Sequence, residues 1–406
     1  MHVCAEKENL LGLKYVETLE ENNKVLLKEP ECFHLTKDNI LEKSYYVTVE
    51  KLIGEGSSCK NYEVLYKSQT KSIEEKCILK ELYPRECGEI YRVWYDETKI
   101  CLGIQGKTSA ITELLKDEYD RYKKNYEKVM SLGNTPLKDN IVGIISDFFD
   151  IVYKNEDIDY IKAYLVTEKD NCKSCMEWIK NEKIELLERL NFFVVLIDVV
   201  KKFYDEGYLI SDLNLNNLLY KKEDTTLKIK VLDYDSIIKL DEINSKIFLP
   251  RTNLYYPTEY NDYNGNEKSD TVTIDCRSSI YSLGIIFLEI LFSLKITNDS
   301  IPAVESKMHF NYFRNSYMNK VFSQFSNGFK NKVIQILKKS IRNNKIHRYD
   351  SFEDMKKDIK DLIEIYENKG VHPEVMLNNA IILAETYKKN DFDECLFTNV
   401  KEITEN

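Results

Sequence analysis

Residues 208–219 read YLISDLNLNNLL and place an aspartate, Asp212, five positions before an asparagine, Asn217. A second aspartate, Asp233, follows the strand-like run 227–232. Transfer of a phosphoryl group needs metal ions that bridge phosphate oxygens and a carboxylate that receives the proton of the acceptor hydroxyl. One acid, one amide oxygen and a second acid in this order suit that chemistry. These residues therefore predict a phosphoryl-transfer site.

Two weaker signals lie upstream of this stretch. Residues 54–59 (GEGSSC) follow a strand-like segment, and Gly54 and Gly56 carry no side chain that would keep a polyphosphate away from the backbone. Taken alone, this glycine pair is as well explained by a hairpin turn. Lys80 ends the apolar run CILK, where a lysine either extends along the surface to water or reaches a phosphate. Lys80 follows the glycine pair closely enough along the chain for both to contact one polyphosphate. Each observation therefore strengthens the functional interpretation of the other.

The order of elements predicts an α+β protein with a cleft between two unlike lobes. The first third alternates apolar and polar residues and is rich in Tyr, Val and Ile, which is typical of strands. The expected strands lie at 45–53, 61–67, 76–82, 141–149 and 160–167, with an irregular insertion at 84–110. Apolar residues three and four positions apart predict helices, most of them later in the chain. The expected helices lie at 111–132, from about 184, and at 277–293, 328–342 and 351–367.

In the order and spacing of these motifs, the chain resembles the eukaryotic-type (Hanks-type) serine/threonine protein kinase family. The matching positions are Gly54 and Gly56 in the phosphate-covering loop, Lys80 in the VAIK-type strand, Asp212 and Asn217 in the HRDLKPEN-type loop, Asp233 in the DFG-type motif, residues 252–259 (TNLYYPTE) in the GTPGYMAPE-type segment, residues 277–284 (RSSIYSLG), and Arg348 in a late R-x-x-S segment. The sequences GEGSSCKNYEV and LKELYPRE are similar to divergent bacterial members.

The resemblance covers residues 45–367 and implies a two-lobed, protein-kinase-like fold. A small β-rich N-lobe would span 45–168 and a larger helical C-lobe 169–367. Residues 1–44 would form an N-terminal extension and residues 368–406 a C-terminal tail, in which the apolar spacing of 374–387 predicts a helix.

The resemblance also implies a cofactor, a metal and a set of roles. ATP would lie between the lobes, with its adenine near the hinge at 167–169 and Thr167 as gatekeeper. The implied ATP-binding residues are Gly54, Gly56, Lys80 and Glu168. The implied Mg²⁺ ligands are Asn217 and Asp233. The implied catalytic residues are Lys80 and Asp212, the latter deprotonating a Ser or Thr hydroxyl of a protein substrate. An ion pair between Glu259 and Arg348 would brace the C-lobe.

The chain departs from the family pattern at several positions near the expected site. Ile210 and Ser211 replace the His and Arg that precede the catalytic Asp, and Asn214 replaces the Lys two residues after it. Loss of that Arg implies that phosphorylation of the activation loop is not the main switch. Asp235 stands at the DFG glycine and Ser279 at an aspartate that ties down the catalytic loop.

The acid that would pair with Lys80 stays open. An ungapped match of residues 121–132 to the family's helix C places Asn125 at the position of the usual glutamate. At about 100° per residue, Glu127 points roughly 200° away from Asn125. A shift in register would bring Glu118 or Glu127 to Lys80 instead.

Three functions are compatible with these residues. Retention of Lys80, Asp212, Asn217 and Asp233 favours an active protein kinase. The departures leave open a nucleotide-binding pseudokinase that acts as a regulatory scaffold. A kinase-fold enzyme that acts on a small molecule is disfavoured by residues 252–259, because that segment shapes a polypeptide groove in protein kinases.

Composition narrows the class of protein further. The chain has 406 residues, a net charge of −10 and 31% charged residues, which argues against a general nucleic-acid binder. No stretch has the roughly 18 uncharged apolar residues of a membrane span, and residues 285–294 contain Glu289. The N-terminus is not a secretory signal, and ten scattered cysteines suit a cytoplasmic protein. Cys172 and Cys175 have metal-site spacing, but a plain turn is favoured because no second pair exists.

Overall fold

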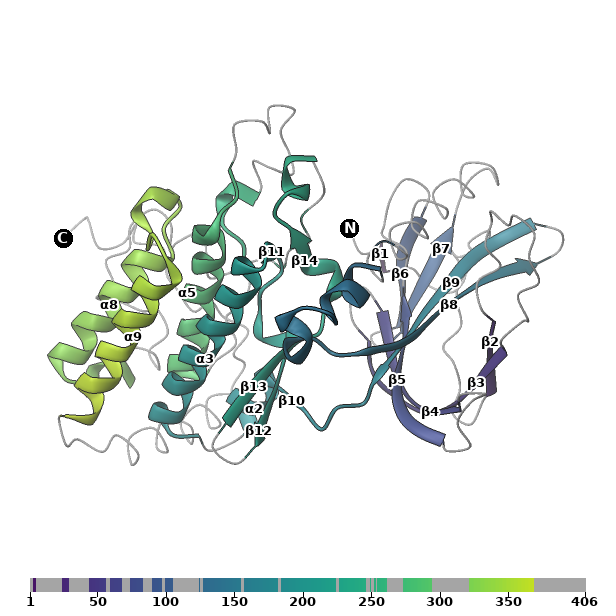
Figure 1. The fold of residues 1–406 in the computed structure, drawn as a ribbon, viewed down its shortest axis with the longest axis horizontal. Helices are drawn as coiled ribbons and strands as arrows, with labels where there is room; N and C mark the ends of the chain where they lie inside the picture. Colours follow the sequence, from purple (N-terminus) through teal and green to yellow (C-terminus); the bar gives the residue numbers. More distant parts are fainter. Residues whose placement is uncertain are drawn as a thin grey trace. The chain divides into compact units, whose positions relative to one another are not determined.

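The structure, a computed structural model, divides into two compact units, Met1–Asp170 and Asn171–Asn406 (Figure 1). Each unit is described by itself. The described residues are 3–4, 24–28, 44–55, 59–67, 74–82, 90–96, 99–104, 124, 127–154, 157–181, 184–223, 226–245, 249, 252, 254–260, 273–293 and 321–368.

The first unit is built on a six-stranded antiparallel sheet. Its strands, in spatial order, are β2 (Lys24–Lys28), β3 (Ser44–Glu55), β4 (Cys59–Lys67), β5 (Glu74–Leu82), β9 (Asp157–Glu168) and β8 (Ile144–Lys154). The expected strands at 45–53, 61–67, 76–82 and 160–167 are confirmed, and the one at 141–149 begins three residues later than expected. The edge strands β2 and β8 also contact each other, so the sheet curls towards closure.

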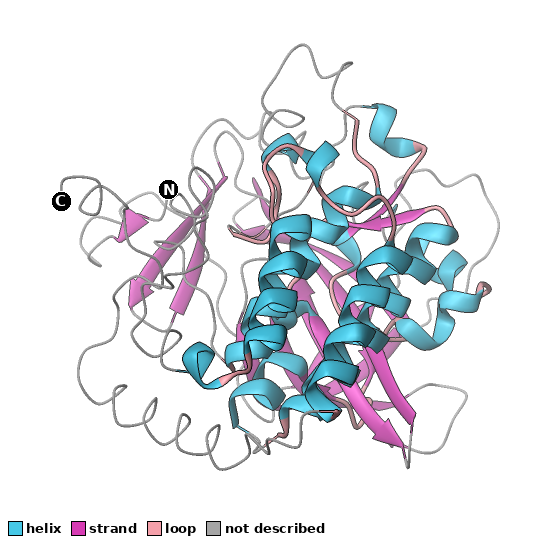
Figure 2. Cartoon of the chain, turned by 90° about the vertical axis from the view of Figure 1, so that its left-hand side faces the viewer, coloured by secondary structure: helices cyan, strands magenta, loops and turns pink. Residues whose placement is uncertain are grey.

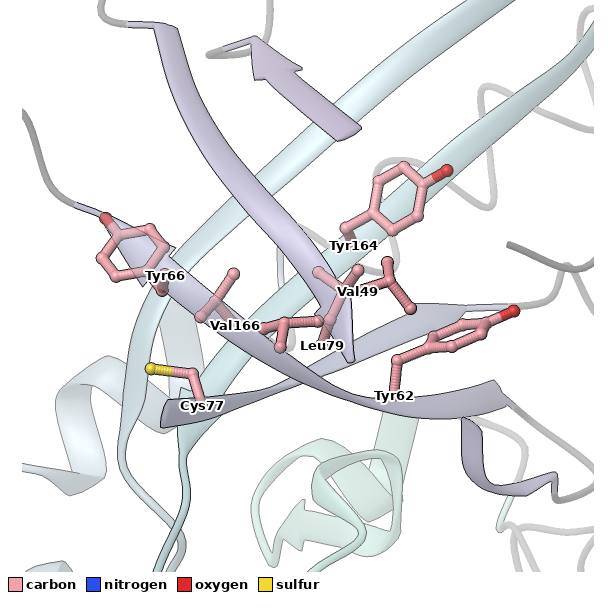
Figure 3. Packing of buried hydrophobic residues seen from close by; sticks show 8 residues of the cluster. Val49, Tyr62, Tyr66, Cys77, Leu79, Tyr164 and Val166 are labelled. Atoms are coloured by element: carbon pink, nitrogen blue, oxygen red, sulfur yellow. The ribbon is translucent and has the colours of Figure 1, made fainter. Parts of the chain in front are cut away.

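One face of this sheet carries a continuous apolar cluster (Figure 3). Its members come from four neighbouring strands and are Val49, Tyr62, Val64, Tyr66, Cys77, Leu79, Tyr164 and Val166. Opposite residues of neighbouring strands share a face, and Tyr62, Leu79 and Val166 form one such row. Because side chains alternate along a strand, Lys80 points to the face opposite this cluster.

The insertion expected to be irregular at 84–110 contains a hairpin. Strands β6 (Ile90–Asp96) and β7 (Lys99–Ile104) pair in antiparallel fashion, and β1 (Val3–Cys4) pairs with β6 in parallel. The expectation of an irregular segment is wrong. Pro84 and the glycines favour turns, but the β-branched and aromatic residues between them favour strands, and the strands form. Of the helix expected at 111–132, the structure describes residue 124 and residues 127–132, which are helical.

The second unit packs four main helices around one another (Figures 1 and 2). They are α3 (Leu186–Asp205), α5 (Cys276–Phe292), α8 (Asn327–Ser340) and α9 (Phe352–Glu367), and a short helix, α2 (Cys175–Asn181), precedes them. Every residue of α5 from Ser278 to Phe292 is buried, so α5 is the central helix. Asp275 begins it, because its carboxylate accepts a hydrogen bond from the Arg277 amide and satisfies a free N–H of the first turn.

Gly284 lets α5 pack closely against α8. A Cβ atom at Gly284 would lie 2.4 Å from Ser340 Oγ and 2.7 Å from Ile341. Two small ladders complete the unit: β10 (Lys173–Ser174), β12 (Leu218–Glu223) and β13 (Thr226–Val231) form one, and β11 (Tyr208–Ile210) and β14 (Ile237–Lys239) form the other.

The predicted α+β class, with a β-rich N-terminal part followed by a helical C-terminal part, is confirmed. Among the described residues, no helix combines the length and apolarity that crossing a membrane requires. The helix expected at 374–387 and the rest of the C-terminal tail lie outside the described residues.

Candidate active site

The loop that carries Asp212 is fixed by the ladder that precedes it. Ile210 pairs with Ile237 at the end of the β11–β14 ladder. Beyond this pair, the amide of Ser211 donates to the carbonyl of Ser236 at 2.8 Å, and the Ser211 hydroxyl donates to the same carbonyl at 3.2 Å. Ser211 is 2% exposed, so the residue at the family's arginine position is a buried hydroxyl that ties the loop to the segment after Asp233.

Asn217 and Asp233 lie at the same end of the β12–β13 hairpin. The ladder ends with Leu218 opposite Val231, and the Leu232 amide then donates to the Asn217 carbonyl at 2.9 Å. Asp233 is the next residue, so the two expected metal ligands are adjacent because the hairpin register places them there. A turn follows directly, in which the Asp235 amide donates to Asp233 Oδ1 at 3.1 Å.

Both carboxylate oxygens of Asp212 accept hydrogen bonds from neutral groups. Oδ1 accepts from the Thr252 amide at 2.7 Å and from Asn214 Nδ2 at 3.1 Å. Oδ2 accepts from the Thr252 hydroxyl at 3.0 Å and from Asn217 Nδ2 at 3.0 Å. Each oxygen therefore has two donors, which fixes the direction of the carboxylate.

The residues at the hairpin end suit Mg²⁺. The Asn217 amide nitrogen donates to the backbone carbonyl and to the carboxylate of Asp212, which leaves its amide oxygen for another partner. That oxygen and the Asp233 carboxylate are hard donors of the kind Mg²⁺ takes. Within the described part of the chain, no group of three or more His, Cys, Asp or Glu side chains could hold a metal. Phosphate and water oxygens would therefore complete the shell of such an ion.

A buried ion pair lies elsewhere in the second unit. Arg348 Nη1 and Nη2 donate to Glu259 Oε1 and Oε2 at 2.6 and 2.9 Å, and the Arg348 side chain is fully buried. Ser278 donates to Glu259 Oε1 at 2.9 Å. The remaining Arg348 protons go to backbone carbonyls of Arg277, Arg342 and Asn343. The expected Glu259–Arg348 pair is confirmed.

The segment 252–260 is anchored on the central helix α5. Tyr255 Oη donates to Glu289 Oε1 at 2.6 Å, and the Ser282 hydroxyl donates to the Tyr255 carbonyl at 2.6 Å. Burial, together with the negative charge of Glu289, raises the pKa of Tyr255 well above its usual range, so the phenol stays a donor. Leu254 has φ of 88°, a region that favours glycine, so the segment holds a strained residue between its anchor and Thr252.

These features occur in one order along the chain. A β-rich unit is followed by a helical unit that holds the Asp212 loop, the Asp233 turn and the Glu259–Arg348 pair. The chain has a protein-kinase-like fold.

Of three comparisons with known proteins, one found similar proteins. No protein-family model matches the sequence, and no curated protein matches it. Among solved structures, the kinase domain of PknI from Mycobacterium tuberculosis is similar, with 12% identity, a TM-score of 0.44 and coverage of 78% of this chain and 96% of that domain. Its C20A_R136A double mutant gives 11% identity, a TM-score of 0.45, and coverage of 78% and 95%.

In the first unit, Lys80 lies in a row of cross-strand neighbours with Gly54. Gly54 pairs with Asn61, and Asn61 pairs with Lys80, so Lys80 is two strands, or about 10 Å, from Gly54. A Cβ atom at Gly54 would meet nothing within 4 Å, so the space there is open. Thr167 pairs with Ile78 and therefore shares the face of Lys80, where its hydroxyl donates to the Ile78 carbonyl at 3.5 Å.

Glu168, the other expected ATP-binding residue, is bound through its backbone. Its amide donates to the Gly143 carbonyl at 3.0 Å. A Cβ atom at Gly143 would lie 2.6 Å from the carboxyl end of the Glu168 side chain, so that carboxylate packs directly over the Gly143 backbone. Gly56, Glu118 and Asn125 lie outside the described residues. Glu127 is exposed on its helical turn, whereas Val129 and Leu132 are buried, in agreement with the expected phase.

The sequence analysis missed the roles of three residues. Asn214 was treated as the loss of a lysine, although it bonds to Asp212. Thr252 was matched to a family motif without a role, and its position in TNLYYPTE was the available signal. Glu289 was noted only because it interrupts an apolar run, yet a buried acid inside a helix needs a partner, here Tyr255.

Cys172 and Cys175 precede and begin α2, and burial raises the pKa of the Cys175 thiol.

Proposed function

We propose that the protein is an ATP-dependent serine/threonine protein kinase of the Hanks type, similar to divergent bacterial members. The observation that carries this proposal is the placing of Asp212, Asn217 and Asp233 by one loop and one hairpin end. Asn217 bonds to the Asp212 carboxylate on one side and, through its carbonyl, to the residue before Asp233 on the other. Asp212, the proposed proton acceptor, is thereby connected through hydrogen bonds to Asn217 and Asp233, the proposed Mg²⁺ ligands.

In this proposal each residue has one task. Asp212 orients the Ser or Thr hydroxyl of a protein substrate and receives its proton. Asn217 and Asp233 hold Mg²⁺, which neutralises charge on the phosphates when it is bound. Lys80, on the face of the sheet opposite the apolar cluster and two strands from Gly54, binds the phosphates of ATP. Gly54, Gly56 and Glu168 supply backbone to the nucleotide. Positioning and charge neutralisation provide most of the rate.

Apolar packing of two residues that follow Asp233 agrees with a site that does not depend on phosphorylation. Ile243 and Leu249 are 6% and 0% exposed and belong to a cluster with Leu209, Ile238 and Tyr260. These contacts hold the two residues against the β11–β14 ladder and involve no charge. Ser211, at the family's arginine position, likewise offers no charge that would bind a phosphate. We place the protein in the cytoplasm and expect no nucleic-acid partner.

One observation favours a second function, a nucleotide-binding pseudokinase that serves as a regulatory scaffold. All four hydrogen bonds that we describe at Asp212 come from neutral groups, and Asn214 stands where the family has a cation. A site without that charge would stabilise the transferring phosphoryl group less well. Such a site would transfer the phosphoryl group slowly, or bind the nucleotide without transferring it.

The test is transfer from γ-labelled ATP with Mg²⁺ to a generic basic protein, with Asp212→Asn as the control. We expect label on the acceptor with the wild-type protein and a loss of about a thousandfold or more in Asp212→Asn, because the proton acceptor is gone. Nucleotide should still raise the melting temperature of Asp212→Asn. In Asp233→Asn, Mg·ATP binding itself should weaken.

The outcomes separate the two functions. Label transfer that Asp212→Asn abolishes supports the kinase. A nucleotide-dependent rise in melting temperature without any transfer supports the pseudokinase. Transfer that persists in Asp212→Asn would contradict the assignment of the site.

A further inference from the structure

Asn214 makes two separate sets of contacts from one buried side chain. It is 2% exposed. Its amide oxygen accepts from the Asn216 amide at 3.0 Å and so caps the short turn η3 (Leu215–Asn217). Its amide nitrogen lies 3.1 Å from Asp212 Oδ1, 3.1 Å from the Asp212 backbone carbonyl and 3.5 Å from Thr252 Oγ1. The oxygen end of the side chain therefore caps the turn, and the nitrogen end binds both the backbone and the carboxylate of Asp212 and reaches the threonine.

Thr252 reaches the same carboxylate from a different part of the chain. Its amide and hydroxyl bind the two oxygens of Asp212 at 2.7 and 3.0 Å. The Tyr255 amide donates back to the Thr252 carbonyl at 3.3 Å, and Tyr255 is fixed to α5 by Glu289 and Ser282. Thr252 is thus connected to α5 through Tyr255. Asn214 connects Thr252 to the loop that carries Asp212.

A neutral amide differs from an ammonium group in what it can fix. An ammonium is a point charge with freely rotating donors, whereas the amide is planar and its oxygen is already committed to the Asn216 amide. The direction of the Asn214 nitrogen is therefore set by the turn that the same side chain caps. The amide can orient the Asp212 carboxylate without adding a charge beside it.

We propose that Asn214 is a positioning residue for phosphoryl transfer. It couples the turn 215–217 to the Asp212–Thr252 contact and holds the carboxylate in the direction needed by a substrate hydroxyl. This inference rests on the proposed kinase function. It predicts that the donor end of Asn214 affects the rate of transfer, whereas the capping end affects only the order of the loop.

Asn214→Ser separates these two ends. Serine caps a helical turn as well as asparagine does, but its side chain is too short to reach both Asp212 and Thr252. We expect kcat to fall about tenfold while KM for ATP changes less than twofold, since one hydrogen bond that directs the carboxylate is lost. The matched control is Asn344→Ser, because Asn344 caps η8 (Lys345–His347) in the same way, outside the Asp212 network.

Thr252 supplies the second arm of the experiment. Thr252→Val should lower kcat by a similar factor, and Thr252→Ser, which keeps the hydroxyl, should restore it. In the double variant Asn214→Ser/Thr252→Val, we expect a combined loss smaller than the product of the single losses, because the two side chains belong to one network. Independent, multiplicative losses or an unchanged kcat in Asn214→Ser would overturn the proposal.

Hydrogen–deuterium exchange of the Thr252 amide tests the inference without ATP. That amide donates to Asp212 Oδ1, and we expect its exchange to become several-fold faster in Asn214→Ser but not in Asn344→Ser. If the wild-type protein transfers no phosphoryl group while this exchange responds, the kinase proposal fails and the coupling stands. If transfer occurs but neither kcat nor exchange responds to Asn214→Ser, the positioning role is wrong and the kinase function stands.

Discussion

Asp212 and Glu259 are two carboxylates of the same unit that are held in opposite ways. Asp212 accepts from two side-chain amides, one backbone amide and one hydroxyl. Glu259 faces the guanidinium of Arg348 in a two-point contact, with the Ser278 hydroxyl beside it. One carboxylate has neutral partners, and the other has a buried, permanent cation.

The difference teaches what each carboxylate is suited to do. A buried pair of opposite charges is costly to separate, so Glu259 is fixed for the lifetime of the fold. Neutral donors release a carboxylate at lower cost, so Asp212 can exchange a partner for an incoming hydroxyl. The acid that we propose as reactive and the structural acid thus differ in the charge of their partners.

The largest effect is expected from breaking the ionic member of this comparison. Arg348→Ala should lower the free energy of unfolding by about 3–5 kcal/mol, because Glu259 would keep its buried charge without a cation. Urea denaturation followed by fluorescence measures this. A loss below about 1 kcal/mol would show that the two carboxylates do not differ in the way described.

The control for Arg348→Ala is an exposed pair of the same unit. Lys222 and Glu188 are 2.7 Å apart, with side chains 58% and 43% exposed. Lys222→Ala should leave the midpoint of urea denaturation close to that of the wild type, because water screens the pair.

The next effect tests the anchor of the segment that holds Asp212. Tyr255→Phe removes the hydrogen bond to the buried Glu289 and should cost about 1–3 kcal/mol, since a fully buried acid loses a donor. It should also lower the rate of transfer, because the Tyr255 amide holds the Thr252 carbonyl and Thr252 binds Asp212. If both the melting temperature and the rate of transfer are unchanged, the Tyr255–Glu289 hydrogen bond does not hold Thr252 in place.

A third carboxylate, Asp358, sharpens the comparison because it has both kinds of partner. It accepts from Lys332 at 2.8 Å, Lys339 at 3.3 Å and Tyr349 at 2.7 Å. Burial opposes ionisation, but the hydrogen bonds from Lys332, Tyr349 and Lys339 outweigh it and hold the pKa of Asp358 below its usual range.

This shift gives a dependence of stability on pH. Because the folded-state pKa is lowered, the stabilisation is complete above the unfolded pKa of about 4 and is lost as the pH falls through the folded value. Asp358→Asn should cost about 1–2 kcal/mol at pH 7 and make the loss of melting temperature below pH 4 less steep. Asp205→Asn, which alters an exposed pair with Lys201, should leave that slope unchanged.

The smallest effect is expected at Ser211. Ser211→Ala removes the hydroxyl bond to the Ser236 carbonyl, which keeps its 2.8 Å bond from the Ser211 amide. We expect a loss of less than about 1 kcal/mol and transfer within about threefold of the wild type. A large loss of transfer would show that the hydroxyl, and not the backbone ladder, positions the Asp212 loop.

The sequence predicted the features that depend on pattern. The apolar run at 277–293 became α5 (Cys276–Phe292), because a helix that is apolar on all sides must be central. The Glu259–Arg348 pair followed from the resemblance, because an acid and an arginine at fixed motif positions have few other partners in a core. The strand-like run 227–232 before Asp233 is confirmed as β13 (Thr226–Val231), whereas its hairpin partner β12, which brings Asn217 to Asp233, was not predicted.

The sequence did not predict features that depend on where a side chain points. Asn214 looked like a missing charge, because the direction of its amide is set by the turn it caps and by Thr252, 38 residues later. The strain at Leu254 was equally hidden, because only the backbone shows it. The β6–β7 hairpin carries a local signal in its β-branched and aromatic residues, but its parallel pairing with β1 is a contact that no local pattern records.

The strand β2 has a consequence for how the first unit can be divided. It covers one edge of the sheet by pairing with β3, and it also contacts β8 at the other edge. A fragment that starts at the first recognisable motif, near residue 45, would uncover both edges at once. Exposed strand edges pair with other chains. Such a fragment should therefore self-associate at high concentration, and its loss from solution would reflect a missing strand and not a missing ligand.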